Sequence, residues 1–250
     1  MSIYHDVMAR YYDALTADVP YGEYVLFLEK IFRREKAEPG LILDLACGTG
    51  SVTKLLAERG YDVIGADSSM DMLTVASGKC ASLPDPPTFI CQSMTELDLY
   101  GTVGAVVSFL DSVNYLSDPA DLRRAFGRVS LFLEPGGLFV FDLNTAAKFA
   151  SISGNAFVRE TDGLFCVWES AWDERSRLAG FYLDFFEERK KGVYVRSSEE
   201  HRERAYSVEE IALTLSENGM ELIKTYGNLK LRPPKEDEDR IFCVARKKKR

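Results

Sequence analysis

The fold is decided by one stretch of the chain, Leu41-Ile42-Leu43-Asp44-Leu45-Ala46-Cys47-Gly48-Thr49-Gly50. Its first six residues form a mostly apolar run, which is typical of a strand that is covered on both faces. The glycines that follow indicate a tight turn, and Val52, Leu55 and Leu56 then recur at helical spacing. We therefore expect a strand, a glycine-rich loop and a helix, which together begin a parallel α/β sheet.

The same alternation of strands and helices continues on both sides of this stretch. We expect further strands at residues 61–66, 88–91, 103–110 and 138–143, and helices at 21–32, 70–77 and 118–133. Two last strands are expected at 220–226 and 240–245. The link between them is too short for a typical crossover helix, so this terminal pair should be antiparallel. The pattern predicts an α/β fold with a doubly wound, mostly parallel sheet.

The pattern changes after about residue 150. Three segments, 156–172, 177–189 and 192–206, are rich in aromatic and β-branched residues and are separated by hairpin-type turns. We interpret them as a small antiparallel β meander, after which a capping box at residues 207–210 begins a helix. We therefore expect a main domain of residues 1–150 and 207–250. The inserted residues 151–206 are expected to form a substrate lid or the face of a homodimer.

Composition and charge exclude several classes of protein. The formal net charge of −8 argues against a nucleic-acid partner, because such binding depends on lysine and arginine. No stretch approaches the roughly 18 consecutive apolar residues of a membrane span. Five cysteines without a C-x-x-C pair, with only two histidines, give no metal-site spacing and indicate reduced thiols. Because the first residues also do not resemble a signal peptide, we expect a cytoplasmic protein.

Two aspartates close to the glycine-rich turn indicate what it binds. Residues 48–53 match only part of a dinucleotide fingerprint, but Asp67 follows the second strand, where a carboxylate can accept hydrogen bonds from a ribose. Asp44 lies at the approach to the turn, where a negative charge suits a positively charged ligand better than a pyrophosphate. This favours S-adenosylmethionine over NAD. Alternatively, Asp44 caps backbone amides of the loop and Asp67 caps the next helix.

Four segments in the expected order, 43–50, 65–73, 109–116 and 133–137, resemble the motifs of class I S-adenosylmethionine-dependent methyltransferases. The opening tyrosines and the inserted meander are similar to those of a bacterial small-molecule subgroup, which includes sugar-amine and glycine-type N-methyltransferases. The resemblance implies a Rossmann-like, seven-stranded sheet with a terminal antiparallel pair. It also implies that a methyl group is transferred by in-line displacement to a nitrogen or oxygen atom of a small-molecule acceptor, without a metal.

The resemblance assigns a set of cofactor contacts to the ends of the strands and to the N-terminal helix. It places the methionyl end on backbone atoms, the ribose on Asp67, and the adenine beside the residues after the third strand. The family often has an acidic residue where this chain has Ser93, so Ser93 or Gln92 is expected as a neutral acceptor. The expected cofactor-binding residues are Tyr4, Tyr12, Asp44, Ala46, Gly48, Asp67, Ser68, Met72, Gln92, Ser93, Met94 and Leu110.

The candidates for the acceptor side follow the fourth strand and lie in the meander. Asp111, Asn114 and Tyr115 are the expected catalytic residues of the loop, and Asn114 and Tyr115 have loop structure and cofactor packing as the alternative role. His201 is the candidate from the meander, with a half-buried structural histidine as its alternative. Two other functions remain open at this point: a nicotinamide-dependent oxidoreductase, and a non-catalytic protein that binds S-adenosylmethionine for a partner.

Overall fold

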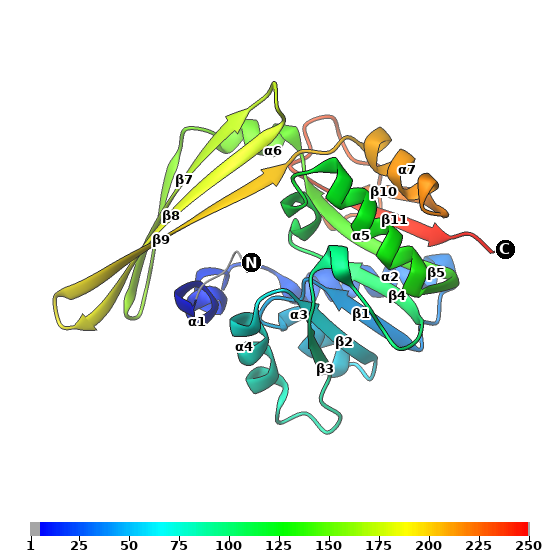
Figure 1. The fold of residues 1–250 in the computed structure, drawn as a ribbon, viewed down its shortest axis with the longest axis horizontal. Helices are drawn as coiled ribbons and strands as arrows, with labels where there is room; N and C mark the ends of the chain where they lie inside the picture. The colour runs from blue at the N-terminus through cyan, green and yellow to red at the C-terminus, as the bar shows by residue number, and fades with distance from the viewer. Residues whose placement is uncertain (1–5, 250) are drawn as a thin grey trace.

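The computed structural model describes residues 6–249 and contains two β-sheets (Figure 1). The larger sheet has seven strands in the order β10-β11-β5-β4-β1-β2-β3. These strands are β1 (Leu41–Leu45), β2 (Asp62–Asp67), β3 (Thr88–Cys91), β4 (Val103–Ser108), β5 (Leu133–Asn144), β10 (Met220–Gly227) and β11 (Arg240–Lys247). The predicted mostly parallel, doubly wound fold is confirmed.

The glycine-rich turn starts at the centre of this sheet. Strand β1 pairs in parallel with both β2 and β4, and β5 pairs in parallel with β4. Only β11 runs in the opposite direction, antiparallel to β5 on one side and to β10 on the other. From β1, the next strands in the chain are added first on one side of the sheet (β2, β3) and then on the other (β4, β5). The loops after β1, β2 and β4 therefore converge at one edge, which is where such sheets bind ligands.

Helices cover both faces of the seven-stranded sheet, which is why its strands read as continuous apolar runs. On one face, α2 (Tyr21–Glu35) and α3 (Ser51–Ala57) bury residues such as Phe27 against Phe242 of β11. On the other face, α5 (Pro119–Phe132) and α7 (Val208–Glu217) cover β4, β5 and β11, with Phe126 against Phe139. Helix α4 (Met70–Cys80) lies against β2 and β3.

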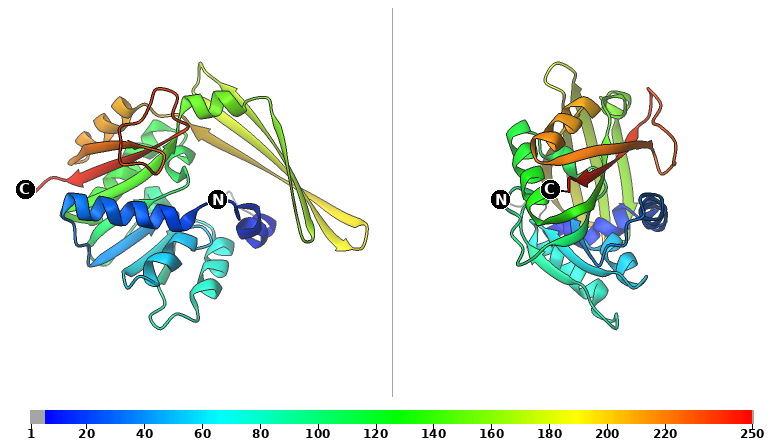
Figure 2. Two further views of the ribbon diagram at one scale, coloured as in Figure 1. Left: turned by 180° about the vertical axis from the view of Figure 1, so that it is seen from behind. Right: turned by 90° about the vertical axis from the view of Figure 1, so that its right-hand side faces the viewer.

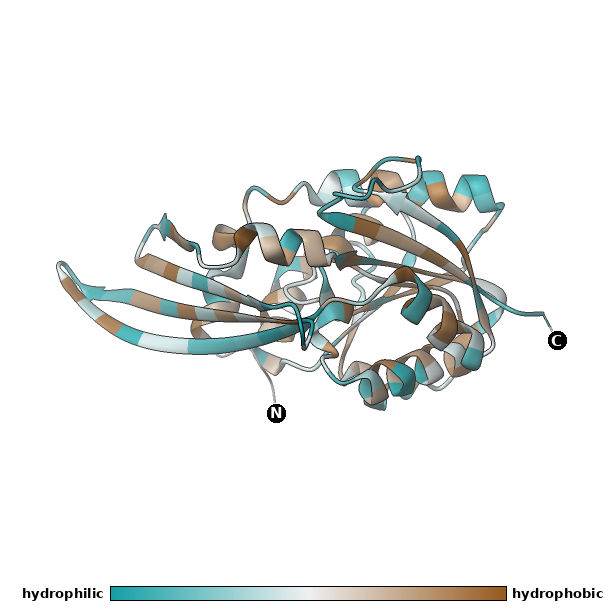
Figure 3. Ribbon diagram, turned by 90° about the horizontal axis from the view of Figure 1, so that it is seen from above, coloured by the Kyte–Doolittle hydropathy of each residue, from teal (hydrophilic) through white to brown (hydrophobic). Residues whose placement is uncertain are grey.

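The predicted meander is the second sheet, with four antiparallel strands in chain order, which we call the insert. It follows a short helix, α6 (Ala146–Ile152), and comprises β6 (Ala156–Thr161), β7 (Leu164–Asp173), β8 (Leu178–Lys190) and β9 (Val193–Arg204). The predicted segment 156–172 is therefore two strands, because the chain turns at Asp162 and Gly163, where Gly163 has a φ of 80°. Figure 3 shows hydrophilic and hydrophobic bands that alternate along the far end of the insert.

Helix α1 (Asp6–Leu15) lies between the insert and the main body, next to α4 (Figures 1 and 2). On the body side, Asp13 accepts a hydrogen bond from Thr49 in the glycine-rich turn at 2.6 Å and pairs with Lys79 of α4 at 2.7 Å. On the insert side, Arg10 forms an ion pair with Glu187 of β8. The helix thus joins two parts of the fold that belong to different sheets.

Candidate functional site

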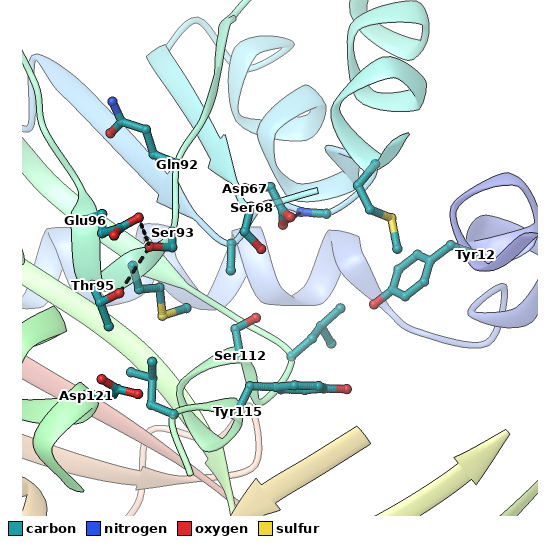
Figure 4. Close-up of a pocket in the computed structure, with 16 residues that line it drawn as sticks. Tyr12, Asp67, Ser68, Gln92, Ser93, Thr95, Glu96, Ser112, Tyr115 and Asp121 are labelled. Carbon is teal, nitrogen blue, oxygen red and sulfur yellow. Dashed lines mark hydrogen bonds between the residues drawn. The ribbon is translucent and has the colours of Figure 1, made fainter. Parts of the chain in front are cut away.

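A cavity of about 480 Å³ lies at the carboxyl ends of β1, β2 and β4 (Figure 4). This volume is within the usual range for small-molecule and cofactor sites. The described residues that line it are Tyr12, Ala46, Gly48, Asp67, Ser68, Met72, Gln92, Ser93, Met94, Thr95, Glu96, Leu110, Ser112, Tyr115, Leu116 and Asp121. The structure therefore brings together nearly all the predicted cofactor residues. Tyr4 lies outside the described residues.

The loop after β1 owes its shape to three residues in the left-handed region of backbone conformation. Ala46, Gly48 and Gly50 have φ angles of 60°, 55° and 73°. Glycine adopts this conformation freely, whereas for Ala46 it costs about 1–2 kcal/mol. Such strain in a non-glycine residue is found mainly at functional sites. Both Ala46 and Gly48 line the cavity.

Asp67 fixes this loop against the start of α4. Its two carboxylate oxygens accept hydrogen bonds from the backbone N–H groups of Gly48, at 2.9 Å, and Ser69, at 2.8 Å. Asp67 is only 7% exposed, and this burial raises the pKa of its carboxyl group. The helix cap of α4 is supplied by Ser69, so capping does not explain Asp67. Because each oxygen retains a free lone pair, Asp67 can still accept hydrogen bonds from a ligand in the cavity.

Asp44 is a buried carboxylate whose described hydrogen-bond partner is a neutral hydroxyl. Thr53 donates to it at 2.5 Å, and the side chain borders a smaller hollow beside the main cavity, next to Ala46 and Gly48. Burial, with a smaller contribution from the charge of Asp67, raises the pKa of Asp44 to about 7. A positively charged ligand group would supply the counter-charge that the carboxylate lacks. The residues present therefore fit a cationic adenosyl cofactor.

The wall beyond β3 contains Thr95 and Glu96, which were not predicted from the sequence. The side-chain amide of Gln92 donates to the backbone carbonyl of Asp98 at 3.0 Å and accepts from its N–H at 2.8 Å, so Ser93 is the better candidate of the two for a neutral acceptor. The hydroxyl of Ser93 lies 3.1 Å from that of Thr95 and donates to Glu96 at 3.4 Å (Figure 4). Glu96 therefore places a carboxylate three residues after the position where the family often has one.

The loop after β4 is also strained, and the predicted catalytic residue Asp111 helps to hold it. Leu110 and Asp111 have φ angles of 58° and 55°, and Leu110 lines the cavity. The backbone N–H of Asp111 donates to Asp142 at 3.1 Å, and Arg240 bridges the carboxylates of Asp111, at 2.6 Å, and Asp142, at 2.5 Å. The carboxylate of Asp111 is absent from the described cavity wall, and its catalytic role stays a prediction.

Asn114 is completely buried below the same loop. Its amide group donates to the backbone carbonyls of Asn144 and Arg204, at 3.0 Å and 2.9 Å, and accepts from the backbone N–H of Asn144 at 3.0 Å. These contacts join the loop to β5 and to the end of β9. They match the structural alternative for Asn114, which does not appear among the described residues of the cavity wall.

Tyr115 and Tyr12 reach the cavity from different elements. Tyr115 ends η2 (Ser112–Tyr115), whereas Tyr12 comes from α1, and their rings approach the same space (Figure 4). His201 of β9 lies behind Tyr115, with an edge-to-face ring contact at 5.9 Å between centroids, and is 2% exposed. Its Nε2 atom is 3.1 Å from Glu199. His201 therefore contacts a cavity residue without being part of the described wall.

Two negative findings apply to the part of the chain that the structure describes. Residues 6–249 contain no group of three or more histidine, cysteine, aspartate or glutamate side chains that is arranged to hold a metal ion. Within the same range, none of the helices has the length and apolar character needed to cross a membrane.

Known proteins match nearly the whole chain, and one family model matches part of it. Residues 42–137 match the family model of a methyltransferase domain. The chain is 33% identical over 245 residues to the Bacillus subtilis (strain 168) protein YqeM, provisionally named a methyltransferase, with 96% of each chain covered. It also resembles the crystal structure of an S-adenosylmethionine-dependent methyltransferase from Clostridium acetobutylicum ATCC 824. That match has a TM-score of 0.86 and 29% identity, and covers 99% of this chain and 100% of the other.

A more distant relative has a named substrate. The dTDP-3-amino-3,4,6-trideoxy-alpha-D-glucopyranose N,N-dimethyltransferase of Streptomyces venezuelae is 35% identical over 112 residues. This similarity covers 45% of the present chain and 46% of the relative.

The contacts of Asn114 lead to a prediction about stability. Asn114→Ala removes three hydrogen bonds and leaves their backbone partners buried, so the free energy of unfolding should fall by about 2–4 kcal/mol. Asn155→Ala is the matched control, because Asn155 is exposed and its amide makes one long contact of 3.4 Å. The control should change stability by less than about 0.5 kcal/mol. Urea titrations that give equal stabilities for the two variants would contradict the proposed structural role.

Proposed function

Because the chain belongs to the family of S-adenosylmethionine-dependent methyltransferases, we propose that it transfers a methyl group to a small-molecule acceptor, through a nitrogen or oxygen atom. One observation carries the proposal: a single cavity joins the strained loops after β1 and β4, Asp67 and the rings of Tyr12 and Tyr115. Family membership removes the nicotinamide-dependent alternative. Cytoplasmic location and a homodimer stay predictions.

The proposed cofactor position follows from the polar groups of the wall. Asp67 accepts hydrogen bonds from the ribose hydroxyls, and the backbone of Ala46 and Gly48 lies along the methionyl end. Asp44 supplies the negative charge for that end, because it is buried next to the same loop. Ser93, together with Glu96, offers acceptors to the adenine amino group.

When bound, S-adenosylmethionine supplies a methyl group on a positively charged sulfur, which is already activated for transfer. The chain then has to orient the acceptor and exclude water. Leu110 and the ring of Tyr115 form an apolar wall on the acceptor side of the proposed cofactor position, and Tyr12 covers it from α1. The hydroxyl of Tyr115 is the group we assign to hydrogen bonding with the acceptor.

A small acceptor is supported by the position of the insert. Strand β9 lies against η2, and its His201 supports the ring of Tyr115, so the insert limits the space in front of the cavity. The name of the Streptomyces venezuelae relative describes methylation of a sugar amine, which is also a small molecule, and this similarity supports a small acceptor. We assign the insert, residues 151–206, the role of a cover over the acceptor.

The direct test is incubation with S-adenosylmethionine that carries a labelled methyl group and a bacterial small-molecule extract. Mass spectrometry of the labelled products then identifies the acceptor and the methylated atom. Transfer of the label to one or a few compounds is expected. If S-adenosylhomocysteine binds but no compound becomes labelled, the protein is a binding partner and not a small-molecule methyltransferase.

Replacing Asp67 tests the ribose contact. Asp67→Ala should weaken binding of S-adenosylhomocysteine by about 1–3 kcal/mol, because a hydrogen bond to a charged group is lost. The matched control is Asp62→Ala, since Asp62 is exposed at the opposite end of the same strand. Calorimetric titration of both variants provides the measurement. An unchanged dissociation constant for Asp67→Ala would remove the ribose assignment.

The raised pKa of Asp44, about 7, predicts a pH dependence of cofactor binding. A cationic ligand requires the ionised carboxylate, so below pH 7 binding has to release a proton. The affinity for S-adenosylmethionine should therefore fall about tenfold between pH 8 and pH 6. Binding at pH 6 should release up to one more proton in the native protein than in Asp44→Asn. Calorimetry in two buffers measures this, and equal pH profiles for the two proteins would contradict the assignment.

The variant Tyr115→Phe distinguishes a role of the hydroxyl group in turnover from a role of the ring in packing. The variant keeps the ring that contacts His201 and removes the hydroxyl, so turnover should fall about tenfold or more. The dissociation constant for S-adenosylhomocysteine should change by less than about twofold, because the apolar contact is preserved. Tyr182→Phe is the control, since Tyr182 is exposed on the insert. A variant that loses cofactor affinity but keeps turnover would make Tyr115 a cofactor-packing residue.

A further inference from the structure

A group of charged side chains is buried where the base of the insert meets the loop after β4. Strand β9 runs from the far end of the insert to this place (Figure 1). The group has one residue from each of four parts of the fold: Asp111 of the loop, Asp142 of β5, Glu203 of β9 and Arg240 of β11. Asp142 is fully buried and Glu203 is 3% exposed. These two carboxyl groups therefore have little access to water.

The pairing of β5 with β11 places these side chains side by side. Arg240 lies directly opposite Asn144 of β5, and Asp142 points to the same face as Asn144 because the two are separated by one residue. The side-chain amide of Asn144 donates to a carboxyl oxygen of Glu203 at 3.4 Å. Glu203 thus contacts a residue whose neighbours on the same face are Asp142 and Arg240.

The positive charge of Arg240 is already used by two of the three carboxyl groups. Its guanidinium group pairs with Asp111 at 2.6 Å and with Asp142 at 2.5 Å. Asp142 also accepts a hydrogen bond from the backbone N–H of Asp111 at 3.1 Å. None of the ion pairs that the structure describes between residues 6 and 249 includes Glu203. Glu203 is therefore a third carboxyl group beside a single cation.

The surroundings of Glu203 keep it un-ionised. Its neighbour on β8 is Ala179, which carries no charge, and the next side chain on the same face of β9 is that of His201. Burial, together with the negative charges of Asp111 and Asp142, raises the pKa of Glu203 well above its ordinary value of 4.5. The hydrogen bond from the neighbouring amide and the charge of the guanidinium group lower the pKa by less. The group retains its proton because ionisation would leave an unpaired buried charge.

Asn144 connects Glu203 with the cavity. The side chain of Asn114 donates to the backbone carbonyl of Asn144 and accepts from its N–H, both at 3.0 Å. Asn114 belongs to η2, which ends at Tyr115, and Tyr115 lines the cavity. Glu203 and Asn114 therefore hold the same residue of β5, one from the insert and the other from the loop after β4.

We propose that Glu203 is a positioning residue of the acceptor side, which as an un-ionised carboxylic acid attaches the insert to the loop after β4. The inference rests on the proposed function, because its effect on methyl transfer acts through the position of Tyr115. A carboxylic acid can accept the hydrogen bond from Asn144 and also donate its own proton to a neighbouring acceptor. An ionised Glu203 can only accept, and it is repelled by the carboxylates of Asp111 and Asp142.

The first test compares the pH dependence of stability in the native protein and in Glu203→Gln, whose amide replaces the un-ionised acid. The folded chain holds the proton of Glu203 more tightly than the unfolded chain does, so stability falls as the pH rises above 4.5. Between pH 5 and pH 8, the unfolding equilibrium constant should rise about tenfold more in the native protein than in the variant. Urea titrations at the two pH values measure this. Other buried acids titrate in both proteins, so their effect cancels.

Two further variants complete this test. Glu203→Met has a similar length and no titratable group, so it should lose the same pH dependence, and it supplies the measurement if Glu203→Gln does not fold. Glu200→Gln is the matched control, because Glu200 is exposed on the same strand, and it should keep the native pH dependence. Equal pH dependence in the native protein and the Glu203 variants overturns the proposal. Failure of both variants to fold also overturns it, because the position then requires the ionised group.

The second test measures turnover with the acceptor that the labelled-methyl assay identifies. Glu203→Gln should retain turnover within about threefold, whereas Glu203→Met, which forms no comparable hydrogen bond with Asn144, should lose about tenfold or more. Loss of turnover in both variants, or in neither, overturns the positioning role. If the native protein labels no compound, the proposed function is overturned, and the urea titrations still decide whether Glu203 is un-ionised.

Discussion

The double hydrogen bond from Gly48 and Ser69 to the carboxylate of Asp67 is the contact on which the site depends. It joins the loop after β1 to the turn before α4, so the ends of two neighbouring strands form one surface. Ala46 sits in this loop in an unfavourable left-handed conformation, which needs surrounding contacts to persist. The bond from Cys47 N–H to the carbonyl of Ala66 adds a second link between the two strands. These contacts hold the ends of β1 and β2 together as one part of the cavity wall.

Much of the fold could be predicted because its strands are buried on both faces and its helices have clear periodicity. The short link between β10 and β11 was enough to predict their antiparallel pairing. The turn at Asp162 and Gly163 was missed because β6 is short and ends in the polar residues 159–161, so no separate apolar run marks it as a strand of its own. Helix α6 was missed because seven residues are too few to show a helical period.

The two sides of the site differed in how far the sequence could predict them. The cofactor side consists of residues next to strand ends, and the order of strands places them together. On the acceptor side, Asp111 and Asn114 have polar side chains in the right loop, but partners distant in sequence engage them. Asp142, Arg240 and Arg204 lie 30 to 130 positions away, and no spacing rule connects them to that loop. Only the packed structure shows that these side chains stabilise the loop.

Helix α1 connects the loop after β1 to the insert. Asp13 attaches the helix to the cofactor loop and to α4, whereas Arg10 attaches it to the insert. A rotation of the insert away from the seven-stranded sheet therefore pulls on the segment that carries Tyr12. One helix of ten residues thus carries a residue of the cavity wall together with the contacts that tie both sheets to it.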